Sequence, residues 1–305
     1  MEAVEKTKLE KSKSNIKGIN HQNYLQRLKS YRTKPGSFLL MLLVMISAVL
    51  TVSVLAFLLG YILVKGIPYL SADLFSWKYT SENVSLVPAM INTLIMTAFS
   101  LLISVPLGVF AAIYMVEYAK KGNKIVKVVR VMAETLSGIP SIVYGLFGLL
   151  FFVTALKWGL SITAGAATLA IMVLPTIMRT TEEALLAIPD SYREGSFGLG
   201  AGKLRTVFRI VLPAAFPGIL TGIILAVGRI VGETAALIYT AGTAPEIPNS
   251  LMSSGRTLSV HMYSLSNNGL HTNQTYATAV VLLIIVVLIN ALSSFVAKKL
   301  GSKDK

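Results

Sequence analysis

The 305-residue sequence contains no cysteine and only three histidines. A chain without cysteine cannot form a disulfide, a thiolate zinc site, an iron–sulfur cluster or a cysteine nucleophile. His21, His261 and His271 are scattered along the sequence and lack the spacing of a metal site. The sequence therefore predicts that the chain holds no metal.

Charged residues are also scarce, at 14% of the chain, whereas hydrophobic residues make up 54%. A water-soluble protein of this size needs more polar surface than this composition provides. We therefore expect most of the chain to lie in a lipid bilayer.

Long apolar stretches support this interpretation. About 20 apolar residues are needed for a helix to cross the roughly 30 Å hydrocarbon core. Six stretches meet this requirement: residues 38–64, 87–116, 135–156, 158–178, 211–241 and a part of 276–297. We expect an all-α membrane protein with six transmembrane helices. Its membrane domain covers residues 37–300, between a basic cytoplasmic tail at 1–36 and a short tail at 301–305.

The basic residues are distributed unevenly between the loops. The segments 1–36, 117–134, 179–209 and 298–305 carry 23 of the 28 lysines and arginines, and they all fall on one side of a six-helix topology. Cytoplasmic loops are the basic ones in membrane proteins. Both termini are therefore expected in the cytoplasm. The net charge of +14 reflects topology and gives no reason to expect nucleic-acid binding.

The loop at residues 179–213 has the pattern of a folded segment. Ser191 and Glu194 form a capping-box pattern after Pro189, and Gly200 can end the resulting helix with a left-handed residue. A second short helix is expected from Lys203. Phe197, Leu199 and Leu204 would be exposed apolar residues here, which favours a covering partner protein. The alternative is a linker that folds back on its own bundle.

The spacing of this loop resembles a known family motif. Glu194-Gly195-Ser196, then Gly200 and residues 210–213 with the sequence Ile-Val-Leu-Pro, match the EAA loop of ABC importer permeases, with two small residues in place of two alanines. The resemblance implies a type I ABC importer permease fold. It also implies that Glu194, Gly195, Ser196 and Gly200 form a cytoplasmic coupling helix docked in a separate ATPase dimer.

A glycine-rich run beside this motif fails as a phosphate-binding loop. The P-loop pattern requires glycine at Phe197 and a hydroxyl residue at Leu204, so the magnesium ligand is missing. The chain is therefore predicted to bind no cofactor and to be no enzyme. ATP and magnesium would be used by the partner ATPase.

Two charged residues, Arg229 and Glu233, lie within the fifth apolar stretch. A charged side chain at the bilayer centre costs at least about 2.5 to 3.5 kcal/mol. Positions i and i+4 share one helical face, so these side chains are expected to pair and to face the bundle interior or a wet cavity. They would then lie on a substrate path or gate; a salt bridge that only fixes packing is the alternative. Glycines recur around them at four-residue spacing, which favours close helix contact: Gly218, Gly222, Gly228 and Gly232.

The segment 228–242 resembles the G-R-x-x-G-E-T-A-P-L motif of PstA-type permeases of phosphate ABC transporters, with Ala236 in place of proline. The likeness extends through residues 134–148, residues 179–200 and Asn290. It implies phosphate as cargo. It also implies a PstC-like second permease, a PstB-like ATPase dimer, an external PstS-like binding protein, and a bacterial or archaeal cytoplasmic membrane. An ABC permease for another oxyanion or small solute, an ion-coupled secondary carrier and a subunit that merely anchors the ATPase are the alternatives.

Gly138-Ile139-Pro140 interrupts the third apolar stretch. Proline lacks a backbone N–H and restricts the residue before it, so a bent helix is expected. Such a break is tolerated beside protein or a water-lined path. The segment thus lies beside the conduit, or the break is a simple packing irregularity.

Overall fold

The computed structural model describes residues 35–120 and 122–301, and these residues form helices and connecting loops without a β-strand. The chain divides into two compact units, Met1–Tyr61 and Ile62–Lys305. Nearly all of the expected N-terminal tail, residues 1–36, lies outside the described residues, as does most of the expected C-terminal tail. The boundaries of the tails stay predictions.

The described part of the first unit is one long helix. Helix α3 (Pro35–Gly66) continues a few residues into the second unit, and its apolar side chains are exposed along most of its length. This agrees with the first predicted apolar stretch, because a helix that is apolar on all faces suits lipid rather than water.

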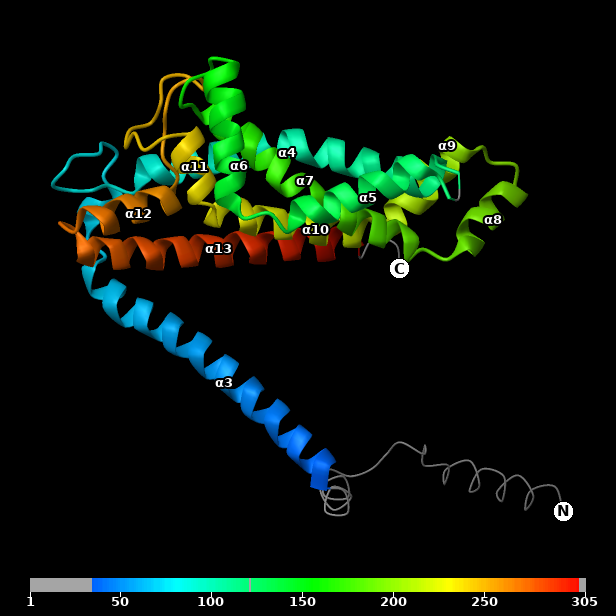
Figure 1. Ribbon diagram of the computed structural model, residues 1–305, viewed down its shortest axis with the longest axis horizontal. Coiled ribbons are helices and arrows are strands. Elements are labelled where there is room, and N and C mark those ends of the chain that lie inside the picture. Colours follow the sequence, from blue (N-terminus) through cyan, green and yellow to red (C-terminus); the bar gives the residue numbers. More distant parts are fainter. Residues whose placement is uncertain (1–34, 121, 302–305) are drawn as a thin grey trace. The chain divides into compact units, whose positions relative to one another are not determined.

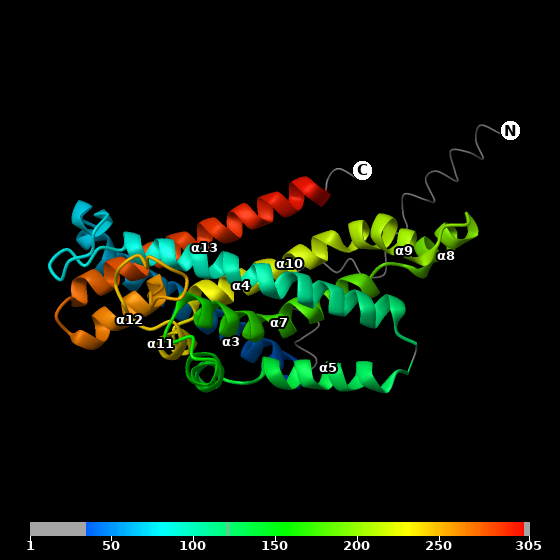
Figure 2. The same cartoon turned by 90° about the horizontal axis from the view of Figure 1, so that it is seen from above.

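Four long helices run side by side in the second unit (Figures 1 and 2): α4 (Val87–Ile113), α7 (Ile162–Leu186), α10 (Leu212–Gly232) and α13 (Thr272–Gly301). Helix α7 is the most buried of the candidate spans and packs against both α4 and α10. The core between them includes Met96, Leu169 and Ile230. Helix α7 ends eight residues beyond the predicted stretch, so the segment from Arg179 to Leu186 is helix rather than loop.

The predicted glycine spacing accounts for the contact between α10 and α7 only in part. A Cβ at Gly218 would lie 2.6 Å from the Cβ of Ala184, and one at Gly222 would collide with the Thr180 hydroxyl. Glycine is therefore required at both positions. Gly228 and Gly232 make no comparably close helix contact.

The third span is bent, as the proline predicted. Helix α5 (Lys124–Ser137) meets α6 (Ser141–Gly148) at 104°, and α6 continues as the π-helical segment η4 (Leu149–Ala155). Helix α5 begins at Lys124, well before the predicted start at residue 135. Helix α6 packs on α11 (Ala235–Thr240), where a Cβ at Gly145 would lie 2.8 Å from Ala236 Cα.

Five helices in the described residues are long and apolar enough to cross a membrane, and the bent pair makes six if it counts as one span. The fifth span begins earlier and ends sooner than predicted. Helix α9 (Lys203–Thr206), the π-helical segment η5 (Val207–Val211) and α10 form one continuous helix that stops at Gly232. The predicted continuation to residue 241 is wrong, because Glu233 is extended and α11 is a separate helix.

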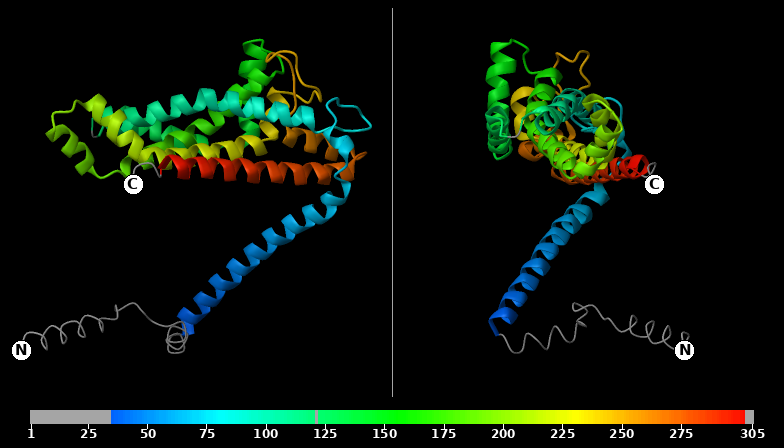
Figure 3. Two further views of the ribbon diagram at one scale, coloured as in Figure 1. Left: turned by 180° about the vertical axis from the view of Figure 1, so that it is seen from behind. Right: turned by 90° about the vertical axis from the view of Figure 1, so that its right-hand side faces the viewer.

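The connecting elements gather at the two ends of the second unit (Figures 1 and 3). One end carries α8 (Asp190–Gly198), α9 and the π-helical turn η3 (Tyr114–Tyr118) that finishes α4. We call it the coupling end. The opposite end carries the short helices η1 (Ile67–Tyr69), η2 (Ala72–Phe75) and α12 (Leu258–Asn268).

Candidate functional site

The predicted short helix after Pro189 is present as α8, and its ends have simple causes. Pro189 is the N-cap residue. The negative charge of Asp190 in the first turn interacts favourably with the positive end of the helix dipole. Gly200 adopts φ +79°; its N–H donates to the Phe197 carbonyl at 2.9 Å, and that of Ala201 donates to the Ser196 carbonyl at 3.1 Å. These bonds form a Schellman motif, so the predicted left-handed termination is confirmed.

The predicted capping box is wrong. Because the helix begins directly after Pro189, Ser191 lies within the first turn and is not the N-cap residue. No side chain caps the helix there. The interactions that fix α8 come instead from its inward face.

Helix α8 has an inward and an outward face. Arg193 is largely buried and Ser196 is 5% exposed, whereas Glu194 is exposed and Leu199, just beyond the helix, is 92% exposed. Gly195 has free space around it, so the alanine of the family motif would fit. Phe197 and Leu204 are also exposed, as predicted. The outward face therefore remains available to a partner even though the inward face is bound to the bundle.

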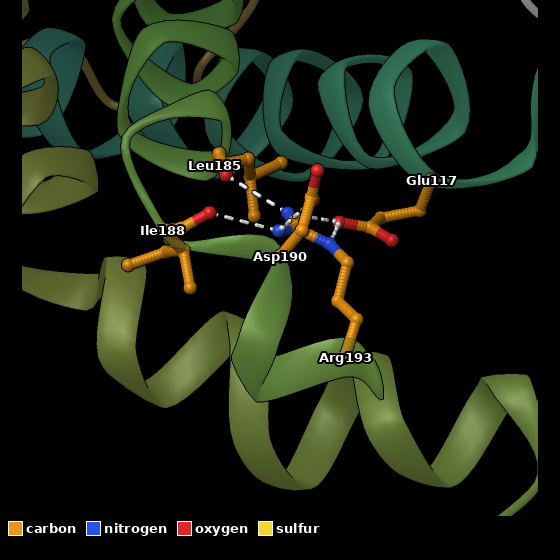
Figure 4. A network of polar contacts seen from close by, with 5 residues as sticks. All are labelled: Glu117, Leu185, Ile188, Asp190 and Arg193. Atoms are coloured by element: carbon orange, nitrogen blue, oxygen red, sulfur yellow. Dashed lines mark hydrogen bonds and ion pairs between the residues drawn. The ribbon is translucent and has the colours of Figure 1, made fainter. Parts of the chain in front are cut away.

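Arg193 fastens α8 to two other helices (Figure 4). Its Nε and Nη2 donate to one carboxylate oxygen of Glu117 on η3, at 3.0 and 2.7 Å. Nη2 also donates to the Leu185 carbonyl at 3.0 Å, and Nη1 donates to the Ile188 carbonyl at 2.9 Å and to Asp190 at 3.2 Å. These five bonds match the five N–H groups of a guanidinium. The carbonyl of Leu185 belongs to the last turn of α7 and Ile188 follows directly, so the cation caps a helix C-terminus.

Two further contacts hold the same segment. The hydroxyl oxygens of Ser196 and Thr206 lie 2.8 Å apart and are both buried. The ammonium of Lys203 lies 5.1 Å from the ring centre of Tyr118 on η3. A groove of about 830 Å³ beside α8 is lined by residues of η3, the end of α7 and α8 itself. The coupling helix is thus joined to α4, α7 and the start of α10.

The predicted pairing of Arg229 with Glu233 is wrong. Helix α10 ends at Gly232 and Glu233 is extended, so the i and i+4 positions do not share a helical face. The buried Glu233 carboxylate accepts a hydrogen bond from the Ala236 N–H at 3.1 Å, and the Glu233 carbonyl accepts one from the Ser259 hydroxyl at 2.5 Å. Glu233 therefore stabilises the first turn of α11.

Arg229 is half-buried, and none of the ion pairs among the described residues includes it. It lies within electrostatic range of Tyr144 on α6, whose hydroxyl donates to the Leu136 carbonyl at 2.7 Å. Tyr144 and the neighbouring Ile230 belong to one core cluster, against which Ile139 packs. The predicted charged residue and the predicted helix break therefore lie together.

The sequence did not identify Arg193 and Glu117 as a pair, although they are the best-bonded charges at the coupling end. They are 76 residues apart, and a single sequence carries no signal that joins them. Arg130 on α5 and the buried Glu182 on α7, whose side chains contact at 2.5 Å, were missed for the same reason.

The opposite end contains a second buried cluster. The Arg256 guanidinium lies 4.7 Å from the ring centre of Tyr79, which contacts His261 edge to face. Arg256 is 6% exposed and His261 is fully buried. Burial and the charge of Arg256 lower the pKa of His261 to about 3, so the imidazole is neutral at neutral pH.

The long apolar helices packed around α7 define an integral membrane subunit. The short helix α8 is bound at one end of them, and its free face exposes Glu194 and Phe197 to a partner. Residues 104–303 match the family model described as binding-protein-dependent transport system inner membrane component. The chain belongs to this family. Its members work with a substrate-binding protein and a separate ATPase, and this chain is a transport subunit.

Known permeases are similar over most of the chain. A probable ABC transporter permease protein, YqgI of Bacillus subtilis, is 35% identical over 73% of this chain and 81% of its own length. The phosphate transport system permease protein PstA of Haemophilus influenzae is 36% identical over 71% of this chain and 77% of its own. PstA 1 of Mycobacterium tuberculosis strain H37Rv is 34% identical over 69% and 70%.

Solved structures show the same fold. A chain of the bacterial alginate ABC transporter aligns with a TM-score of 0.65 at 15% identity, covering 89% of this chain and 98% of the other. A chain of the MetNI methionine ABC transporter aligns with a TM-score of 0.56 at 23% identity, covering 70% and 95%. The predicted ABC importer permease fold is confirmed.

Proposed function

We propose that this chain is the PstA-type permease subunit of an ATP-driven importer of inorganic phosphate. The observation that carries the proposal is α8: its position in the chain matches the EAA motif, its inward face is bound to the bundle through Arg193, and its outward face is free. The identity of 34 to 36% to PstA proteins over about 70% of the chain supports phosphate as cargo.

In this proposal the exposed motif residues Glu194 and Gly195 on α8, with Gly200 just beyond it, dock in a PstB-like ATPase dimer. The fourth motif residue, Ser196, faces inward and holds the coupling helix to Thr206. Closure of the dimer displaces α8, and the bundle changes between outward-open and inward-open states. The chain itself binds no cofactor, and ATP and magnesium are used by the ATPase. A PstC-like permease completes the conduit, and a PstS-like protein delivers phosphate from outside.

Arg229 is the proposed anion contact or gate. A half-buried guanidinium with no carboxylate partner within residues 35–120 and 122–301 can offer several N–H donors to an oxyanion. Because Glu233 is bound to α11 instead, its proposed role is to hold the turn after Gly232, where the path passes the end of α10. Glu233 therefore does not neutralise Arg229 directly, as their expected pairing would have required.

The coupling end is proposed to lie in the cytoplasm of a bacterium or archaeon, together with both termini. The excess of basic residues at this end supports the orientation, since cytoplasmic loops are enriched in lysine and arginine.

Reconstitution of the purified complex in proteoliposomes tests the proposal. We expect ATP-dependent uptake of radioactive phosphate that unlabelled phosphate suppresses and that sulfate and molybdate do not. Uptake of sulfate or molybdate in place of phosphate would show that the cargo is another oxyanion. Uptake by the chain without any ATPase would establish a secondary carrier.

The docking role has a separate test. Glu194→Lys reverses the charge of an exposed residue on α8 and should abolish co-purification of the ATPase, whereas Glu183→Gln, on the exposed end of α7, should preserve it. Normal phosphate uptake after deletion of this chain would reduce it to an anchor for the ATPase.

A further inference from the structure

We propose that the ion pair between Arg193 and Glu117 transmits the displacement of the coupling helix to the transmembrane helices. The inference rests on the proposed function and adds two positioning residues to it, outside the EAA motif residues that dock.

The Arg193–Glu117 pair is much less exposed than other ion pairs at the coupling end. The side chains of Arg193 and Glu117 are 15% and 7% exposed, compared with 61% and 63% for Arg179 and Glu183. Exposed pairs contribute little, whereas removal of one partner of a buried pair leaves an uncompensated charge. A pull on α8 therefore moves Glu117 with Arg193 more readily than it separates them.

The hydrogen bonds of Arg193 fix the orientation of α8 as well as its position. A guanidinium is planar, and here each of its N–H groups has an acceptor on η3, on α8 or at the end of α7. A lysine could supply the charge but not this set of five bonds. Arg193 therefore fixes both the distance and the orientation of α8 relative to the ends of α4 and α7.

Arg193 joins the ends of α4 and α7, and these two helices are closely packed against each other. A Cβ at Gly108 on α4 would lie 2.9 Å from the Ile177 side chain on α7, and Met115, Met178 and Leu185 share one buried cluster. Close-packed interiors transmit displacement instead of absorbing it. Movement at Arg193 therefore reaches α4 and α7 together.

The points of attachment on the bundle coincide with irregular helix. Glu117 and Tyr118 belong to the π-helical turn η3, and Thr206 directly precedes the π-helical segment η5. Wide turns of this kind occur mostly as short interruptions of helices, frequently at functional sites. Here they mark where the spans join the coupling end.

The test uses the reconstituted complex with its ATPase and binding protein and measures phosphate taken up per ATP hydrolysed. In Arg193→Gln and Glu117→Gln we expect the ATPase to remain bound and ATP hydrolysis to persist, while uptake per ATP falls about three- to thirtyfold. Glu183→Gln, which breaks an exposed pair, is the matched control and should leave the ratio unchanged. An unchanged ratio in the two test variants overturns the proposal, as does a parallel loss of hydrolysis and uptake.

A rescue experiment separates transmission from folding. The chain has no native cysteine, so Glu117→Cys with Arg193→Cys can be joined by a reducible thiol cross-linker in a complex whose other subunits also lack cysteine. We expect the cross-link to raise phosphate uptake per ATP in the double variant most of the way to the wild-type value. Reduction of the cross-linker should lower it again. Failure of the cross-link to restore the ratio overturns the proposal.

A readout that needs no cargo distinguishes this inference from the proposed function. Spin labels at Ser191→Cys on α8 and Phe110→Cys on α4 report whether the two helices move together when ATP is added. When Arg193 and Glu117 are intact, the distance between the two labels should stay constant as ATP is added. In the Arg193→Gln variant the distribution of distances should broaden. If the wild-type complex takes up no phosphate, the proposed function fails, and this distance still decides the inference.

Discussion

The carboxylate of Glu233 accepts a hydrogen bond from the backbone N–H of Ala236 at 3.1 Å, across the break between α10 and α11. The motif that this segment resembles has proline at the position of Ala236, and proline has no N–H to donate. In this chain the acidic residue therefore stabilises the helix that follows it.

This contact predicts different effects for two substitutions of Glu233. Glu233→Gln keeps an oxygen that can accept from Ala236, so the complex should keep its thermal stability. Glu233→Ala leaves a buried N–H without a partner, which should cost about 1 to 3 kcal/mol of stability. Thermal unfolding of the purified complex in detergent measures both. Equal stability of the two variants would show that the contact is unimportant.

Arg229→Gln removes the guanidinium that has no carboxylate partner in the described residues. We expect phosphate uptake to fall by about tenfold or more, because a charge-assisted bond to an oxyanion is roughly twice as strong as a neutral one. Arg229→Lys keeps the charge without the planar fork and should have an intermediate effect. Full uptake by Arg229→Gln, measured with radioactive phosphate, would reduce Arg229 to a packing residue.

Gly200 and Gly195 should respond in opposite directions to alanine. Gly200 has φ +79°, where alanine costs roughly 1 to 2 kcal/mol, so Gly200→Ala should loosen the end of α8. Gly195 lies inside the helix with free space around it, and Gly195→Ala should strengthen α8 by up to about 1 kcal/mol. Hydrogen exchange of residues 190–201 measures both changes. Faster exchange in Gly195→Ala would contradict the prediction.

His261 predicts acid sensitivity. Its pKa is about 3 in the folded protein and about 6.5 in an unfolded chain, so the unfolded state takes up a proton first as the pH falls below about 6.5. Stability should then decrease by roughly 1.4 kcal/mol per pH unit until the pH approaches 3. Above pH 7 this residue contributes no pH dependence.

Thermal unfolding between pH 7.5 and 5 measures this loss. His271→Gln, at a partly exposed histidine, should preserve the slope, whereas His261→Gln should reduce it. A slope that is unchanged in His261→Gln would place its origin in other groups.

Most of the spans were predictable from the sequence, because uninterrupted apolar runs have few alternatives to membrane helices. The bend at Pro140 was also predictable, since proline lacks the hydrogen-bond donor. The break after Gly232 has no proline to indicate it and arises from the bonds of Glu233 with Ala236 and Ser259. A tertiary cause of this kind has no local signature.

The candidate site was predictable to a similar degree. The spacing of Glu194, Gly195, Ser196 and Gly200 located α8 and its left-handed end. It could not show that Arg193, next to Glu194, faces the opposite way and contacts a carboxylate 76 residues earlier. Likewise, the pairing of Arg229 with Glu233 followed correctly from an ideal helix, and it failed because the helix ends between them.

The guanidinium at position 193 draws two of its acceptors from main-chain oxygens, those of Leu185 and Ile188. Replacing the side chain at position 185 or 188 leaves those oxygens in place, so a mutational scan of the two positions would report the packing of these side chains and not this half of the attachment. Related chains can therefore vary in sequence at the end of α7 and still retain the same mechanical linkage.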